Sequence, residues 1–218
     1  MVSHPAPGER ERLGPRLYIV TPPISDARRF AASLEAVLDA GDVAALLLRS
    51  TAADEALIRH VATIAPLAHR VGTALLIEAP PELAARTAAD GAHVDAVGGL
   101  SAALKVLKPD RIVGAGGLRT RHDAMVAGEK GADYVMFGEP DATGRRPSVE
   151  AVRERVAWWA ELFEPPCVGF AAGLDEVSQL AEAGADFVAA GDLVWQNADG
   201  PAAGFRALAA RLGTGETV

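Results

Sequence analysis

The residues GADYVMFGE (131–139) and GADFVAAGD (184–192) nearly repeat one another. Each copy follows an Ala-rich stretch of helical character, opens with turn residues, continues as an apolar run too short for a helix, and ends at glycine and a carboxylate. Weaker echoes cover residues 40–48 and 89–94. This recurring order of helix, tight turn and buried strand predicts a parallel α/β protein. In such proteins the chemistry lies at the carboxyl ends of the strands.

The pattern predicts eight strands that alternate with helices along the whole chain. The strands are expected at residues 17–20, 43–48, 74–77, 92–94, 111–113, 134–137, 167–170 and 187–190. Eight equal units fit a closed barrel better than an open sheet, which requires no particular number. We therefore predict a single-domain α/β fold, a (β/α)8 TIM barrel over residues 16–213. The Pro-, Gly- and charge-rich residues 1–15 are expected to form a flexible N-terminal arm.

Composition excludes several classes of partner. The 218 residues carry a formal net charge of −8, which disfavours nucleic acid and anionic membranes. No apolar stretch approaches the length of a membrane span and the first residues are polar, so we expect a soluble, cytoplasmic protein. The single cysteine, Cys167, is expected in the core. The three tryptophans pack helices or form a subunit contact, which is compatible with a homodimer.

Arg49 directly follows the apolar run Leu46–Leu48 at the end of the second expected strand. A strand-terminal arginine points into the mouth of a barrel, where its planar set of donors suits a phosphate. The alternative is an ion pair with Glu78, which ends the next strand, because charges near a core are usually paired.

Small residues follow the last two strands, and these turns are where barrels present backbone amides to a phosphate. The candidates are Ala172, Gly173, Ala190 and Gly191. Small residues at barrel turns also serve packing alone, and the nearby Asp192 would repel a phosphate unless it turns outward. His93 lies in a short apolar strand and is expected to be a packed histidine rather than a base.

The segment 131–138, the turn at 90–93 and the strand end Leu48-Arg49 resemble thiamine phosphate synthase and its TenI-like relatives over residues 17–194. The resemblance implies an enzyme that joins an aminopyrimidine diphosphate to a thiazole phosphate, with Mg2+ on the diphosphate. TenI-like members bind the thiazole phosphate, and some aromatise it. The small phosphorylated heterocycle is therefore the expected partner.

Several positions depart from the family's pattern. The family's Asn-Asp pair after the third strand is Glu78-Ala79 here, and its second Mg2+-binding aspartate falls at Gly98. A lysine two residues after Arg49 is replaced by Thr51, and a serine after the fifth strand by Gly116. Because Mg2+ requires hard oxygen ligands, losing carboxylates weakens such a site severely.

Other positions keep part of the pattern. The family's Thr-x-Thr-Lys after the sixth strand matches residues 143–146, so Thr143 and Arg146 join Arg49 and Glu78 as candidate catalytic residues. Glu78 and Asp95, at neighbouring strand ends, are either replacement metal ligands or ordinary carboxylates of the barrel rim.

The sequence thus predicts a thiamine phosphate synthase-like barrel of thiamine biosynthesis with a degenerate active site. Two alternatives stay open: a non-catalytic, TenI-like protein that binds a phosphate ester, and another phosphate-handling barrel enzyme, such as an isomerase, that shares only the fold.

Overall fold

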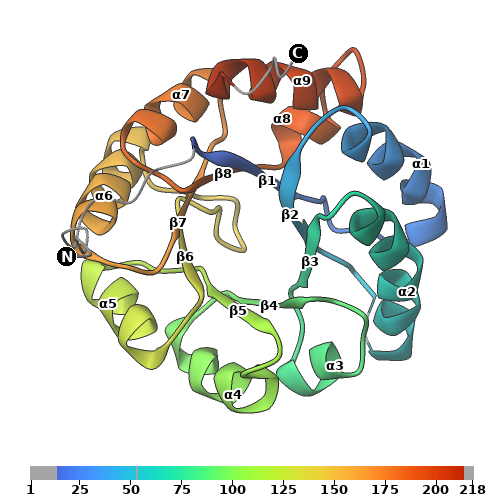
Figure 1. Cartoon of the computed structure of the whole chain (residues 1–218), viewed down its shortest axis with the longest axis horizontal. Coiled ribbons are helices and arrows are strands. Elements are labelled where there is room, and N and C mark those ends of the chain that lie inside the picture. The colour runs from blue at the N-terminus through green and yellow to red at the C-terminus, as the bar shows by residue number, and fades with distance from the viewer. Residues whose placement is uncertain (1–13, 53, 214–218) are drawn as a thin grey trace, which may run out of the picture.

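The computed structural model describes residues 14–52 and 54–213, so most of the expected N-terminal arm lies outside the described residues. Eight parallel strands close into a barrel in chain order, with the helices as an outer ring (Figure 1). The strands are β1 Arg16–Val20, β2 Val43–Leu48, β3 Ala74–Ile77, β4 Gly91–Val94, β5 Ile112–Ala115, β6 Tyr134–Phe137, β7 Cys167–Phe170 and β8 Phe187–Ala190. The predicted (β/α)8 barrel is confirmed.

The helices follow the strands as expected, with one addition. They are α1 Ala27–Leu38, α2 Asp54–Arg70, α3 Pro81–Ala85, α4 Val97–Leu107, α5 Arg121–Lys130, α6 Val149–Leu162, α7 Leu174–Glu182, α8 Asp192–Trp195 and α9 Pro201–Leu212. The short helix α8, directly after β8, was not expected from the sequence. Trp195 at its end donates its indole N–H to the carbonyl of Val20 at 2.7 Å, which fastens the last unit to the first strand.

Strand β5 continues two residues beyond its expected end at Val113, through Gly114 and Ala115. Glycine normally weakens a strand, which is why the sequence suggests an earlier end. Here Gly114 allows close approach of the neighbouring strand, because a Cβ at this position would lie 1.9 Å from the ring of Tyr134.

Alternation along the strands builds two separate cores. Side chains of successive strand residues point to opposite faces, so Leu17 and Ile19 face the helices, whereas Tyr18 and Val20 face the barrel interior. The outer core joins strands to helices and contains most of the buried leucines and valines. The inner core is small and carries two tyrosines, Tyr18 and Tyr134.

The repeated Gly-Ala-Asp phrase is explained by a pair of hydrogen bonds that each aspartate makes to the preceding strand. Asp186 donates its backbone N–H to the carbonyl of Cys167 at 3.0 Å, and its carboxylate accepts the N–H of the same residue at 2.8 Å. Asp133 makes the same two bonds to Val113, and Asp90 to Leu75. The repeat therefore sets the register in which one strand begins beside the next.

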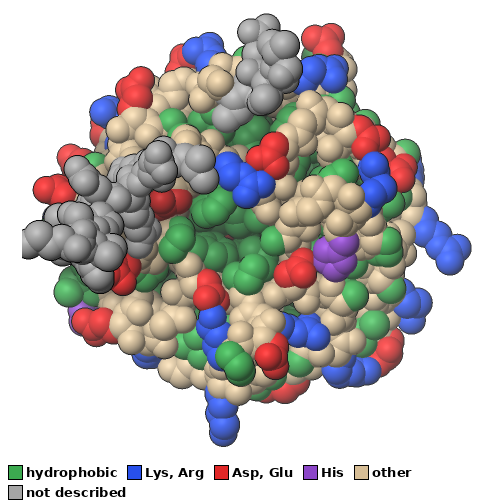
Figure 2. Space-filling model, viewed as in Figure 1, with side chains coloured by type: hydrophobic (Ala, Val, Ile, Leu, Met, Phe, Trp, Pro, Cys, Tyr) green, Lys and Arg blue, Asp and Glu red, His purple; other side chains and the backbone are tan. Residues whose placement is uncertain are grey.

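The amino ends of the strands surround a small apolar cavity of about 150 Å3, lined by residues such as Ala45, Ala74, Leu76 and Val168. Figure 2 shows a hollow with hydrophobic walls at the centre of the barrel, ringed by charged side chains.

Among the described helices, none has the length and apolar character that crossing a membrane requires.

We expect Asp186→Ala to destabilise the barrel by about 1–3 kcal/mol, because it leaves the Cys167 N–H without its acceptor. This corresponds to a fall in Tm of roughly 2–4 °C per kcal/mol for a chain of this size. Thermal unfolding followed by circular dichroism measures the change. Asp199→Ala, at an exposed loop position, is the matched control. An equal Tm for both variants would contradict the role given to the aspartate.

Candidate functional site

Because side chains alternate between the two faces along each strand, polar side chains at the strand ends point into the mouth at the carboxyl end of the barrel. In β2 and β3, Leu48 and Ile77 pack outward against the helices. The next residues, Arg49 and Glu78, therefore point inward. His93 in β4 faces inward in the same way, since its neighbour Ala92 belongs to the outer core.

The mouth opens into a cavity of about 1090 Å3. Its walls include Arg49, Glu78, Asp95, Glu139, Arg145 and Arg146. The segment between β6 and α6 supplies many of these residues and reaches toward the barrel axis in Figure 1. A cavity of this size at the carboxyl ends of the strands is the usual position of a ligand site in this fold.

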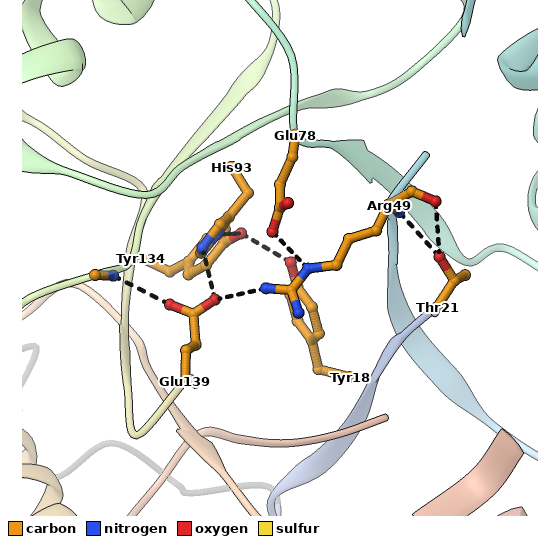
Figure 3. A network of polar contacts seen from close by, with 8 residues as sticks. Tyr18, Thr21, Arg49, Glu78, His93, Tyr134 and Glu139 are labelled. Atoms are coloured by element: carbon orange, nitrogen blue, oxygen red, sulfur yellow. Dashed lines mark hydrogen bonds and ion pairs between the residues drawn. The ribbon is translucent and has the colours of Figure 1, made fainter. Parts of the chain in front are cut away.

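Arg49 lies between two carboxylates that come from different sides of the mouth (Figure 3). Its Nε donates to Glu78 Oε1 at 2.7 Å, and its Nη2 lies 3.5 Å from Glu139 Oε1. Its backbone N–H donates to the Thr21 hydroxyl at 2.9 Å, which joins the ends of β1 and β2. The ion pair with Glu78, the alternative that the sequence left open, is therefore present.

Glu139 is a buried carboxylate of the mouth with partners on several sides. Its side chain is 8% exposed and lies 3.1 Å from His93 Nε2 as well as beside Arg49. Its other oxygen accepts the backbone N–H of Gly117 at 3.2 Å. His93 Nε2 is close to the carboxylate but not in line for a hydrogen bond, so this contact is mainly an ion pair.

Gly116 makes room for this pair. A Cβ at position 116 would lie 2.0 Å from Glu139 Oε2 and 2.3 Å from His93 Nε2. Any larger residue at this position would therefore have to displace the carboxylate or the imidazole.

Each member of the pair favours the charged form of the other. Burial opposes protonation of His93, but the Glu139 carboxylate outweighs it and raises the pKa of His93 above its ordinary value. Burial likewise opposes ionisation of Glu139, yet the cations His93 and Arg49 and the Gly117 N–H hold its pKa below the usual range. Opposite charges in contact favour the charged forms of both groups.

A chain of hydroxyls leads from His93 down the barrel axis. His93 Nδ1 lies 2.8 Å from the Tyr134 hydroxyl, which lies 2.9 Å from the Tyr18 hydroxyl (Figure 3). Burial raises the pKa of both tyrosines, so they are neutral. The inner core thus supports His93 from below with uncharged hydrogen-bonding groups.

The candidate Arg146 lies at the rim beside β7 and is paired with Glu176. Its Nη1 donates to Glu176 Oε2 at 2.8 Å, and its Nη2 donates to the Phe170 carbonyl at 3.1 Å. The same carboxylate accepts the N–H of Ala172 at 2.9 Å. The Glu176 carboxylate therefore already accepts the Ala172 N–H, which was expected to donate to a phosphate.

The remaining candidate residues lie in the loop after β6 and in the turns after β7 and β8. Thr143 is bound inside its own loop, where its hydroxyl donates to Asp141 at 2.6 Å. These bonds from Thr143, with help from Arg145, lower the pKa of Asp141 to about 2. Gly173 precedes α7 and Gly191 precedes α8, and neither residue lines the large cavity within the described part of the chain. Asp192 is exposed.

The residues present do not fit a Mg2+ site. Glu78 is engaged by Arg49 at 2.7 Å, and Asp95 lines the cavity. Over residues 14–52 and 54–213, no group of three or more His, Cys, Asp or Glu side chains is arranged to hold a metal ion. A diphosphate-bound Mg2+ needs hard oxygen ligands, and Glu78 and Asp95 are not gathered into such a set.

Sequence reasoning missed the part that Glu139 and His93 play. Glu139 is the carboxylate that ends the first copy of the repeated phrase, and Gly116 departs from the serine of the related family. Those two signals together point to the pair, because the missing side chain at position 116 is the space that Glu139 occupies.

Comparison with known proteins shows the family of the chain. The family model described as thiamine monophosphate synthase matches residues 17–193. A thiamine-phosphate synthase from Rhodospirillum centenum is 44% identical over 192 residues, covering 86% of this chain and 93% of that protein. Another from Hyphomonas neptunium is 39% identical over 203 residues, covering 88% and 91%.

Solved structures show the same fold at low sequence identity. A thiamine phosphate pyrophosphorylase from Pyrococcus furiosus superposes with a TM-score of 0.72 at 21% identity, covering 93% of this chain and 97% of that one. A 3-hexulose-6-phosphate synthase from Salmonella typhimurium gives 0.69 at 18% identity, with coverage of 92% and 100%. At such identities the likeness shows the barrel alone.

The family match spans nearly all of the barrel, and the curated relatives are similar along most of their own length. The chain therefore belongs to the thiamine monophosphate synthase family, as a thiamine phosphate synthase-like barrel of thiamine biosynthesis.

Proposed function

We propose that the chain binds the phosphorylated pyrimidine and thiazole of thiamine phosphate synthesis at the mouth of the barrel, and that its capacity to join them is severely reduced. The observation that carries this proposal is Arg49, a cation at the wall of a large cavity whose described carboxylates are not gathered into a metal-binding group. The proposed site of action is the cytoplasm.

Arg49 is suited to the diphosphate. Two carboxylates hold its guanidinium through Nε and Nη2. Within the described part of the chain its Nη1 has no hydrogen-bond partner, so it is available to an anion in the cavity. A guanidinium that is already oriented loses less conformational entropy on binding.

The weakened chemistry follows from the ligand set. Ala79 and Gly98 stand where related synthases carry the aspartates on Mg2+, and Thr51 stands where they carry a lysine. A departing diphosphate needs stabilisation by cations. Arg49, His93 and Arg146 are basic groups near the mouth, and each of these three is paired with a carboxylate.

The thiazole phosphate is assigned to the turns after β7 and β8. The proposed donors are the backbone N–H groups of Ala172, Gly173, Ala190 and Gly191, and the Ala172 N–H shares the Glu176 carboxylate with the Arg146 guanidinium. The support is that the Ala172 N–H and Arg146 already hold an anion, the Glu176 carboxylate. A phosphate oxygen could take the same two donors once that carboxylate moves away.

The alternative is a protein that only binds a phosphate ester. The missing metal ligands favour this alternative, and measured turnover decides between the two.

Arg49→Gln is expected to weaken binding of the aminopyrimidine diphosphate by roughly tenfold or more, because a charge-assisted contact is lost. Isothermal titration calorimetry measures the affinity. Arg153→Gln, an exposed position on α6, removes the same charge elsewhere. Equal affinities for the two variants would show that Arg49 does not contact the ligand.

Turnover is expected to be at least about a hundredfold below that of a relative with both aspartates, since one lost group of this kind costs about that factor. Both enzymes are supplied with aminopyrimidine diphosphate and thiazole phosphate, with and without Mg2+. Thiamine phosphate formed is then measured. Matching rates would overturn the view that the centre is degenerate.

Glu176→Gln is expected to strengthen binding of inorganic phosphate several-fold, because it removes the negative charge that competes for Arg146 and the Ala172 N–H. Glu182→Gln, on the same helix but exposed, controls for net charge. Phosphate titrations followed by NMR of the Ala172 amide locate the anion. Tighter binding in both variants, or no response of that amide, would contradict the assignment.

A further inference from the structure

Glu139 has a position and a bonding state that the proposed binding of phosphates leaves unexplained. It lines the cavity, yet its side chain is only 8% exposed. A carboxylate this buried costs free energy unless its charge is compensated. Arg49 and His93 compensate it from two directions, at 3.5 and 3.1 Å.

The basic side chains around Glu139 offset the negative charge of the carboxylates in this cluster. Glu78 lies against Arg49, and Glu139 lies against both Arg49 and His93, so each carboxylate faces a basic side chain. A phosphorylated ligand is therefore not repelled by the cluster as a whole. The carboxylate can remain in place beside a bound diphosphate.

Glu139 also has acceptor capacity to spare. An ionised carboxylate offers about four lone-pair sites, and the contacts to it come from Arg49, His93 and the Gly117 N–H. The carboxylate can only accept hydrogen bonds. The group that completes it from the cavity must therefore be a donor.

The position of Glu139 depends on the space at Gly116. By the resemblance described above, Gly116 falls where the family has a serine after the fifth strand. A Cβ at 116 would lie 2.0 Å from Glu139 Oε2, so the carboxylate lies where a side chain at 116 would begin. A hydroxyl both donates and accepts, whereas Glu139 only accepts.

We propose that the Glu139 carboxylate binds the amino substituent of the pyrimidine and thereby makes the site specific for an amino over an oxo group. The proposal rests on the proposed function, because it takes the aminopyrimidine diphosphate as the ligand. Arg49 and Glu139 are in contact, so one small molecule that carries both an anionic group and an amino group can reach the two side chains together.

The test compares two probes that differ at one substituent: the aminopyrimidine diphosphate and its analogue with an oxo group in place of the amine. Calorimetry without the thiazole gives the Kd of each probe. The wild-type chain is expected to favour the amine by roughly ten- to a hundredfold, as for a hydrogen bond to a charged group. In Glu139→Ala the preference is expected to fall to within about threefold.

The ratio of the two affinities isolates the role of Glu139. Removing the carboxylate also disturbs Arg49 and His93, but that disturbance affects both diphosphates alike and cancels in the ratio. Glu139→Gln keeps one acceptor and is expected to retain part of the preference. Glu154→Gln, exposed on α6, is the matched control and is expected to leave the ratio unchanged.

A second variant covers the case in which Glu139→Ala does not fold. Gly116→Ala keeps the carboxylate but places a methyl group where its oxygen lies, and is expected to reduce the preference too. An unchanged ratio in the Glu139 variants, or no preference in the wild type, overturns the proposal while leaving the proposed function standing. Failure of both probes to bind the wild type overturns the two together.

Discussion

The interior of a closed eight-stranded barrel has room for few side chains, and this constraint governs the rest of the structure. Because successive side chains of a strand point to opposite faces, half of the side chains of each strand point into the barrel. Here the inward positions hold small apolar residues near the amino ends, two neutral tyrosines in the middle, and charged groups at the mouth. Because buried charges must be paired, every ion added at the mouth requires a partner within the same narrow space.

Pairing within that space explains why the mouth forms one connected network. Arg49 contacts both Glu78 and Glu139. Glu139 also contacts His93, whose Nδ1 lies within hydrogen-bond distance of the Tyr134 hydroxyl. Burial alone would neutralise both Glu139 and His93, and their contact reverses this for each. Loss of Arg49 would leave Glu78 without its cation, and loss of Glu139 would leave His93 without its carboxylate, so these groups are coupled rather than independent.

The sequence predicts the fold well because the fold depends on local signals. Periodic apolar runs and the Gly-Ala-Asp turns are readable in one dimension, and the structure shows that each aspartate, such as Asp186, bonds to the preceding strand. Arg49 and Glu78 could be placed at the mouth from strand ends alone. Glu139 and His93 could not be paired in this way, since their contact depends on the space at Gly116.

Arg49 and Arg146 share one property that bears on how a phosphate enters. Arg49 and Arg146 are held by internal carboxylates, Glu78 with Glu139 and Glu176 respectively. An incoming phosphate must compete with a carboxylate already in place, which lowers affinity but keeps each guanidinium oriented. A ligand that makes contacts besides those of its phosphate binds more tightly in such a site, because these contacts offset the free energy lost in displacing the carboxylate. Selectivity at this mouth therefore depends on the groups that recognise the heterocycle, and Glu139 is positioned to be one of them.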